Sequence, residues 1–166
     1  DTAGGLCIAG VFGGIESGVT EKTTNIFLES AYFNASSIRK SSKRHSLKTD
    51  ASFRYERGTD PNITVYALKR SALLIKEIAG GKVSSEIIDI YPTPIENFKV
   101  PFSFEKCDAL IGKKIDLELI KVIITSLGIE IEHEGNDALL LSVPPFKVDV
   151  QREQDVIEEV LRIYGY

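Results

Sequence analysis

The feature that most constrains the fold is the segment Pro92-Thr93-Pro94, with two prolines one residue apart. Proline lacks a backbone N–H and has a fixed φ angle, so this pair stops any regular element and stiffens a connector. The residues after the pair have the complete pattern of a small domain. The sequence therefore predicts two domains, residues 1–92 and residues 93–166.

The second domain is expected to combine strands and helices. Apolar residues alternate from Phe98 to Phe104, which predicts a half-buried strand. Gly135-Asn136-Asp137 is typical of a hairpin turn between two further strands. The expected strands cover residues 98–104, 129–133 and 139–143, and the expected helices cover residues 104–111, 117–127 and 153–164. Asp116 is expected to cap the second of these helices, and Gly128 to end it.

The first domain is also expected to mix both kinds of element. Asn34 is a plausible N-cap, Asp60-Pro61 is typical of a helix start, and Gly80-Gly81 is typical of a helix end. The expected strands cover residues 6–12, 25–33 and 82–91, and the expected helices cover residues 35–45 and 60–78. The chain is therefore predicted to be α+β, with two mixed α/β modules and a mixed sheet in the first.

The composition is that of a soluble globular protein, with 43% hydrophobic and 27% charged residues. No window has the roughly 18 consecutive apolar residues that a membrane helix needs, so no membrane contact is expected. Two distant cysteines, Cys7 and Cys107, argue against a disulfide framework and favour a cytoplasmic protein with buried thiols. The absence of methionine predicts an internal fragment of a longer polypeptide.

Residues 34–58 form a basic island in an otherwise acidic chain. They carry a net charge of +5, against −9 for all other residues. A local concentration of this kind indicates a surface that holds an anionic or planar group. A solvated helix face with incidental lysines explains the same charges, and the charge count alone does not separate the two.

Four carboxylates gather in the sequence near the last expected helix. Asp155, Glu158 and Glu159 share one helix face by spacing, and Asp149 lies one short connection upstream. Oxygen-rich clusters of this kind suit Mg²⁺ or Ca²⁺. The alternative is that acids in the first helical turns stabilise the helix dipole and are solvated. Composition and spacing supply no zinc site, no catalytic triad and no nucleophile, so any hydrolysis would use an activated water.

Long colinear motifs carry a resemblance to a known family. They are Gly13-Gly14, Ser17-Gly18-Val19-Thr20, Asn25-Ile26-Phe27-Leu28-Glu29-Ser30-Ala31-Tyr32-Phe33, Arg44-His45, Thr49-Asp50-Ala51-Ser52, Arg54-Tyr55-Glu56-Arg57-Gly58, Asp60-Pro61 and Ile157-Glu158-Glu159-Val160-Leu161-Arg162-Ile163-Tyr164-Gly165-Tyr166. With these motifs, essentially the whole chain resembles the beta subunit of bacterial phenylalanyl-tRNA synthetase.

The resemblance implies a segment of a tetramer of two alpha and two beta chains. That family charges phenylalanine onto its tRNA with ATP and Mg²⁺, and the charging site lies in the alpha subunit. The beta subunit carries an editing domain that hydrolyses mischarged tyrosyl-tRNA. Residues 1–92 resemble the C-terminal part of this editing domain. Residues 93–166 resemble the following small domain, which has a winged-helix-like α+β fold often labelled DNA-binding-like.

The resemblance also implies roles for particular residues, none of them a catalytic side chain. Glu29 matches the acid that recognises the tyrosine hydroxyl, and Gly13, Thr49 and Ala51 match positions that line the same editing pocket. The family's magnesium ligands, shared with the alpha subunit, match Asp149, Asp155, Glu158 and Glu159. The candidates for contact with tRNA in the basic island are Arg39, Lys43, Arg44 and His45.

Three functions remain open on the sequence. The first is a piece of the charging enzyme with editing in its first domain. In the family, a basic residue and a histidine of the editing pocket lie upstream of residue 1, so this chain alone is expected to edit poorly or not at all. The second is a non-catalytic module that binds tRNA or the alpha subunit. The third, and weakest, is an independent metal-dependent hydrolase built on the four acids.

Overall fold

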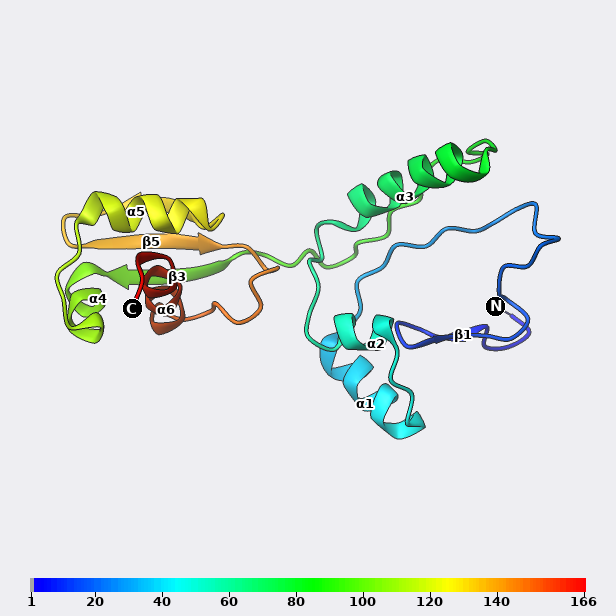
Figure 1. The fold of residues 1–166 in the computed structure, drawn as a ribbon, viewed down its shortest axis with the longest axis horizontal. Helices are drawn as coiled ribbons and strands as arrows, with labels where there is room; N and C mark the ends of the chain where they lie inside the picture. The colour runs from blue at the N-terminus through cyan, green and yellow to red at the C-terminus, as the bar shows by residue number, and fades with distance from the viewer. Residues whose placement is uncertain (1) are drawn as a thin grey trace. The chain divides into compact units, whose positions relative to one another are not determined.

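The computed structural model describes residues 2–166 and divides the chain into two compact units, Asp1–Thr93 and Pro94–Tyr166. We call them unit 1 and unit 2. The described residues contain six helices and two small antiparallel sheets, drawn in Figure 1. The predicted α+β class is therefore confirmed. No helix among residues 2–166 has the length and apolar character to cross a membrane.

Unit 2 contains every element that the sequence predicts after the prolines. In chain order they are β3 (Phe98–Ser103), α4 (Phe104–Ile111), α5 (Leu117–Ser126), β4 (Glu130–Glu134), β5 (Ala138–Val143) and α6 (Glu153–Tyr164). The three strands form an antiparallel sheet in the order β3-β5-β4. Asp116 accepts a hydrogen bond from the Leu119 N–H at 3.0 Å, so the predicted cap of α5 is confirmed.

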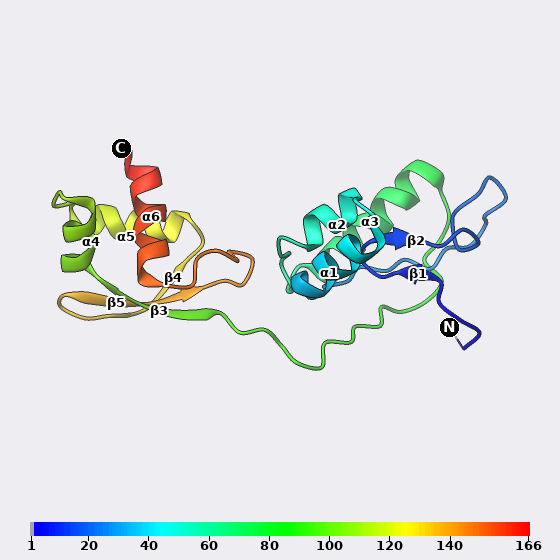
Figure 2. The same cartoon turned by 90° about the horizontal axis from the view of Figure 1, so that it is seen from below.

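The core of unit 2 lies between this sheet and its helices, which pack on one face of the sheet (Figure 2). Val100 and Phe102 point inward from β3 and are each 1% exposed, as the predicted alternation requires. The buried cluster takes apolar side chains from all three helices, among them Ile120, Ile124, Val156 and Val160. Burial of these side chains is the main stabilising term of the unit.

Hydrogen bonds tie the start of α6 to the junction of β3 and α4. The Glu153 carboxylate accepts from the Ser103 N–H at 2.8 Å and from the Lys106 ammonium at 3.0 Å. Cys107 is fully buried beside this junction. Burial, with the nearby charges of Asp108 and Glu153, raises the pKa of the Cys107 thiol to about 11, so the thiol is protonated at neutral pH. Cys7 is exposed, so the expectation of two buried thiols is wrong for Cys7.

The described residues of unit 1 form three helices and one short hairpin. The helices are α1 (Ala35–His45), α2 (Asp50–Tyr55) and α3 (Thr64–Ala79), and the hairpin strands are β1 (Cys7–Ile8) and β2 (Phe12–Gly13). The Asn34 side chain accepts from the Ser37 N–H at 3.0 Å, which confirms the predicted cap of α1. Ile38, the expected apolar anchor of that helix, is 4% exposed.

The single buried strand predicted over residues 6–12 is wrong. The chain reverses at Gly10, whose φ of +68° lies in the left-handed region that glycine adopts readily. A Cβ on Gly10 would lie 2.6 Å from the Ile38 side chain, so the turn also depends on close packing against α1. The reversal pairs β1 with β2, with Cys7 opposite Gly13 and Ile8 opposite Phe12.

The strands predicted over residues 25–33 and 82–91 are also wrong, and with them the mixed sheet of the first module. Both segments lie outside the two sheets that the described residues form. Phe27 is 93% exposed, and Ile88 and Ile90 are each 81% exposed. An apolar extended segment becomes a strand only when a neighbouring strand satisfies its backbone groups, and no described strand pairs with either segment.

Helix α3 begins later than Asp60-Pro61 predicts. The Asp60 carboxylate accepts from the Asn62 N–H at 2.9 Å, so it stabilises a turn that precedes the helix. The predicted end is confirmed, because α3 stops at Ala79 and Gly80 follows with a φ of +74°. None of the α3 residues is fully buried, so its expected core face is only partly covered.

Candidate functional sites

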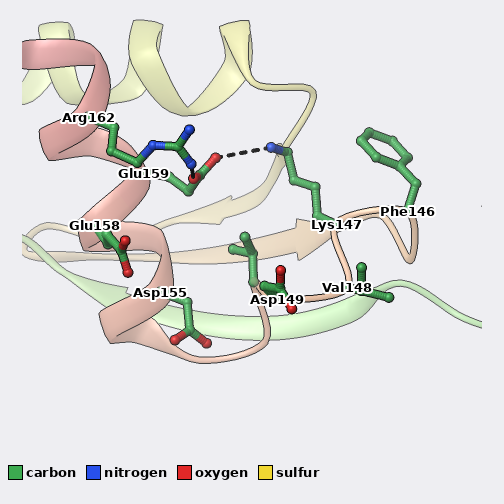
Figure 3. A pocket seen from close by; sticks show the side chains of 9 residues that line it. Phe146, Lys147, Val148, Asp149, Asp155, Glu158, Glu159 and Arg162 are labelled. Carbon is green, nitrogen blue, oxygen red and sulfur yellow. Dashed lines mark hydrogen bonds and ion pairs between the residues drawn. The ribbon is translucent and has the colours of Figure 1, made fainter. Parts of the chain in front are cut away.

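The first candidate site is a pocket of about 300 Å³ between α6 and the segment that leads into it. We call it the acidic pocket, and Figure 3 shows its lining. All four acids of the predicted quartet line it, together with Lys147 and Arg162 among the polar residues. Helical spacing brings three of the acids onto the α6 side, and the path of residues 146–150 brings the fourth, Asp149, to face them.

Glu159 is fully engaged inside the acidic pocket. Its Oε2 accepts from the Lys147 Nζ at 3.3 Å, and its Oε1 accepts from the Arg162 guanidinium. The side chains of Lys147 and Glu159 are 13% and 15% exposed, so this pair is largely shielded from solvent. A shielded pair is screened by salt much less than a surface pair.

Asp155 has a structural role at the start of α6. Its carboxylate accepts from the Arg152 guanidinium at 3.0 Å, from the Arg152 N–H at 2.8 Å and from the Gln151 N–H at 3.1 Å. The Arg152 side chain, supported by these backbone donors, holds the pKa of Asp155 below its usual value. The carboxylate therefore stays ionised and caps the helix.

Asp149 and Glu158 are exposed, and neither side chain makes a hydrogen bond or ion pair within residues 2–166. Over the same residues, no group of three His, Cys, Asp or Glu side chains is arranged to hold a metal ion. The four acids thus share a pocket without forming a complete metal site. A Mg²⁺ ion bound here would need oxygen ligands from outside the described residues.

The second candidate site is a pocket of about 450 Å³ in unit 1, which we call the α2–α3 pocket. Its lining is Ser30, Ala31, Asp50, Ala51, Arg54, Tyr55, Thr59, Asp60, Ile63, Thr64 and Ala67. The Thr59 Oγ1 is buried and has no hydrogen-bond partner among the described residues. Leaving a buried hydroxyl unpaired costs free energy, so a bound group that pairs with it would be favoured.

The structure places only one of the predicted editing residues, Ala51, in this pocket. Thr49 caps α2, and its Oγ1 donates to the Val11 carbonyl at 2.6 Å, which ties the helix to the hairpin. Gly13 lies in β2, and a Cβ added to it would meet no atom within 4 Å. Glu29 is exposed and directly precedes Ser30, which lines the pocket.

Sequence reasoning missed the polar residues of the α2–α3 pocket, among them Arg54, Thr59 and Asp60. The first and third belong to motifs that carry the family resemblance, but the motifs alone gave them no position in a site. Arg54 lies on α2, and Thr59 and Asp60 lie in the turn before α3. Their positions in the sequence indicate a shared site only once it is known that α3 begins at Thr64.

The predicted tRNA-contact residues lie together on α1. Arg39, Lys43, Arg44 and His45 are exposed, and their side chains make no ion pair or hydrogen bond within residues 2–166. Three of them occupy the last turn of α1, where positive charge also favours the helix dipole. Arg57 is different, because it lies 3.5 Å from the centre of the Phe53 ring and pairs with Glu56 at 3.2 Å.

Comparison with known proteins matches both units. Residues 1–80 match the model of the B3/4 domain, and residues 100–166 match that of the tRNA synthetase B5 domain. Among curated relatives, the chain is 58% identical over 161 residues to a phenylalanine–tRNA ligase beta subunit of Bacteroides fragilis, which covers 97% of this chain.

Relatives from other organisms carry the same description. The chain is 50% identical over 97% of its length to the phenylalanine–tRNA ligase beta subunit of Porphyromonas gingivalis. It is 42% identical over its full length to that of Geobacter sulfurreducens. The chain spans about a fifth of the length of these relatives, 20% and 21% respectively. The chain therefore belongs to the family of phenylalanine–tRNA ligase beta subunits, of which it spans a B3/4 domain and a B5 domain.

Proposed function

We propose that the chain is part of a cytoplasmic enzyme that charges phenylalanine onto its tRNA with ATP. In this proposal it works within a tetramer of two alpha and two beta subunits, with charging in the alpha subunit. The observation that carries the proposal is the colinear match of both domain models together with the shared description of the relatives.

Unit 1 would contribute to the editing site that hydrolyses mischarged tyrosyl-tRNA. Glu29 would accept a hydrogen bond from the tyrosine hydroxyl, which phenylalanine cannot donate. A carboxylate desolvated by the bound aminoacyl group and left unpaired costs free energy, so phenylalanine would be rejected here. Gly13, Thr49 and Ala51 would leave room for the aromatic ring, since none carries a large side chain.

Water would attack the ester, helped by a terminal hydroxyl of the tRNA. The ester carbon–oxygen bond breaks, tyrosine is released, and the freed ribose oxygen takes a proton. Attack by water is consistent with the candidate editing residues, because none of them is predicted to act as a nucleophile. The α2–α3 pocket supports the assignment of an editing site to unit 1, because Ala51 lines it together with Ser30 and Ala31, which follow Glu29 in the sequence.

A comparison of this chain with the intact enzyme tests the proposal. We expect the two-subunit enzyme, with the full-length beta chain, to charge phenylalanine and to deacylate tyrosyl-tRNA. The 166-residue chain alone should do neither, because the resemblance implies a charging site in the alpha subunit and further editing residues that this chain does not contain. The measurements are ATP-dependent charging and release of tyrosine from tyrosyl-tRNA. Tyrosine release by the chain alone would contradict the proposed division of the editing site.

The second candidate function, a tRNA-binding module, is favoured by the unpaired cations on α1. We expect Lys43→Gln with Arg44→Gln to weaken tRNA binding by the chain, and to lower the slope of log K against log salt by roughly 1–2, because two phosphate contacts are lost. The matched control is Lys69→Gln with Arg70→Gln, an adjacent pair exposed on α3. Equal losses from both pairs would show that α1 has no special role.

We also propose that unit 2 contributes oxygen ligands to a Mg²⁺ ion shared with the alpha subunit. Asp149 and Glu158 support this, because they line the acidic pocket and their carboxylates have no partner within residues 2–166. Mg²⁺ is commonly held by one or two carboxylates with waters or other oxygen ligands, so two free acids suit a shared site.

A further inference from the structure

An exposed aromatic ring and an arginine form a stacked pair at the C-terminal end of α2. Phe53 is 57% exposed, so more than half of its surface is open to solvent. The Arg57 guanidinium carbon lies 3.5 Å from the centre of the Phe53 ring, which is van der Waals contact. A guanidinium over an aromatic face is a favourable cation–π arrangement. We call these two residues the Phe53–Arg57 platform.

The guanidinium of the platform is held in place by hydrogen bonds. Its Nη1 donates to the Phe53 carbonyl at 2.7 Å and to the Glu56 carboxylate at 3.2 Å. The Arg57 side chain is nevertheless 55% exposed. A flat cation that is already fixed against a ring loses little further conformational entropy when a ligand binds. The platform is therefore pre-organised to stack on a planar group.

The platform lies outside the α2–α3 pocket. The α2 residues that line the pocket include Ala51 and Arg54, whereas neither Phe53 nor Arg57 lines it. Residues two positions apart on a helix point in different directions, which explains why Phe53 and Ala51 serve different surfaces. A planar group on the platform is therefore distinct from the tyrosine ring proposed for the pocket.

The chain around the platform is positively charged. Residues 34–58 carry a net charge of +5. Helix α1, which carries the unpaired cations, packs against α2, and only residues 46–49 separate the two helices in the sequence (Figures 1 and 2). A cationic surface attracts phosphates, whereas an aromatic ring or a guanidinium plane stacks on a base. Together the two features are complementary to an unpaired nucleotide of a nucleic acid.

We propose that the Phe53–Arg57 platform stacks on an unpaired base of bound tRNA while the cations of α1 contact its phosphates. Stacking reads no hydrogen-bond pattern, so the platform accepts any of the four bases. The inference rests on the proposed tRNA-binding function. It adds a contact with a base, which the cations of α1 do not supply, because phosphate contacts position a nucleic acid without reading its bases.

Binding of a short oligoadenylate by the 166-residue chain tests the platform. We expect Phe53→Leu to weaken binding about tenfold, the scale of one lost stacking contact, with an unchanged slope of log K against log salt because no phosphate contact is lost. Phe53→Tyr keeps an aromatic ring and should bind within about twofold of the wild-type chain. Arg57→Lys keeps the charge but not the flat guanidinium, so it should also weaken binding.

An abasic oligonucleotide of the same length separates base stacking from phosphate contacts. It keeps the sugar–phosphate backbone but has no bases, so Phe53→Leu and the wild-type chain should bind it equally. An abasic probe that lost as much affinity as oligoadenylate on Phe53→Leu would overturn the stacking role, because the substitution would then act on the backbone contacts.

Tyr66→Leu is the matched control. Tyr66 is 69% exposed on α3 and also precedes an arginine by four positions, but no ring contact joins it to Arg70 within residues 2–166. Its loss should leave oligoadenylate binding unchanged.

The outcomes distinguish the platform from the tRNA-binding function on which it rests. Wild-type binding by Phe53→Leu would overturn the platform, and the tRNA-binding function would survive if Lys43→Gln with Arg44→Gln still weakened binding. Absence of RNA binding by the wild-type chain would overturn both. If Phe53→Leu does not fold, Arg57→Lys carries the test, and wild-type binding by that folded variant would overturn the platform.

Discussion

Phe102→Ala is expected to lower the free energy of unfolding of unit 2 by about 3–5 kcal/mol, the usual cost of removing a buried phenylalanine. Phe102 is 1% exposed and lies on β3 opposite Leu139. Its ring meets the Phe104 ring edge-on, with centroids 5.8 Å apart and an interplanar angle of 84°. The truncation would remove apolar burial and this aromatic contact together, and would leave a cavity under the helices.

Denaturant unfolding followed by far-UV circular dichroism measures this change in the 166-residue chain. Phe146→Ala is the matched control, because Phe146 is 47% exposed in the same unit and should cost less than about 1 kcal/mol. A Phe102→Ala variant whose unfolding midpoint matched that of Phe146→Ala would contradict the core described for unit 2.

Ala51→Trp in the beta chain of the intact enzyme is expected to reduce deacylation of tyrosyl-tRNA about 100-fold, an effect on the scale of misplacing a bound substrate by an ångström. Ala51 is exposed in the wall of the α2–α3 pocket, where an indole would occupy space proposed for the tyrosine ring. Charging with phenylalanine should be unchanged, because it is proposed to occur in the alpha subunit.

Ala79→Trp is the control for this substitution. Ala79 is exposed at the end of α3 and does not line the pocket, so the same added ring should leave deacylation unchanged. Wild-type deacylation by Ala51→Trp, with both variants folded, would show that the tyrosine side chain binds away from Ala51.

The elements of unit 2 could be predicted from sequence because their signals are local. The cap at Asp116, the hairpin turn before β5 and the alternation along β3 each act within a few residues. These signals agree with one another, and this agreement is what makes a sequence specify one fold. The helices and strands therefore begin and end within about two residues of the predicted positions, close to the usual uncertainty of such boundaries.

The strands of unit 1 could not be predicted in the same way. Residues 25–33 and 82–91 have the apolar composition of strands, but a strand also requires a partner far away in the sequence. No local pattern reveals whether that partner is present. The reversal at Gly10 was missed for a related reason, because it depends on packing against Ile38, 28 positions later.

In the candidate sites, too, local patterns could be predicted from the sequence, whereas contacts between separate segments could not. Helical spacing predicted that Asp155, Glu158 and Glu159 lie together, and the structure gathers them around one pocket. Spacing could not show that Lys147 pairs with Glu159, because this depends on the path of the turn before α6. The family membership is confirmed, whereas the roles of the individual pocket residues stay predictions.

The most direct test of the editing proposal is Glu29→Ala in the beta chain of the intact enzyme, with deacylation of tyrosyl-tRNA and charging with phenylalanine measured in parallel. Deacylation should collapse while charging persists, because Glu29 is proposed to read the tyrosine hydroxyl at a site separate from the charging site. Glu29→Gln, which keeps the size of the side chain, should also lose most of the discrimination. Unchanged deacylation in Glu29→Ala would contradict the account, since Glu29 would then be an exposed acid outside the editing site.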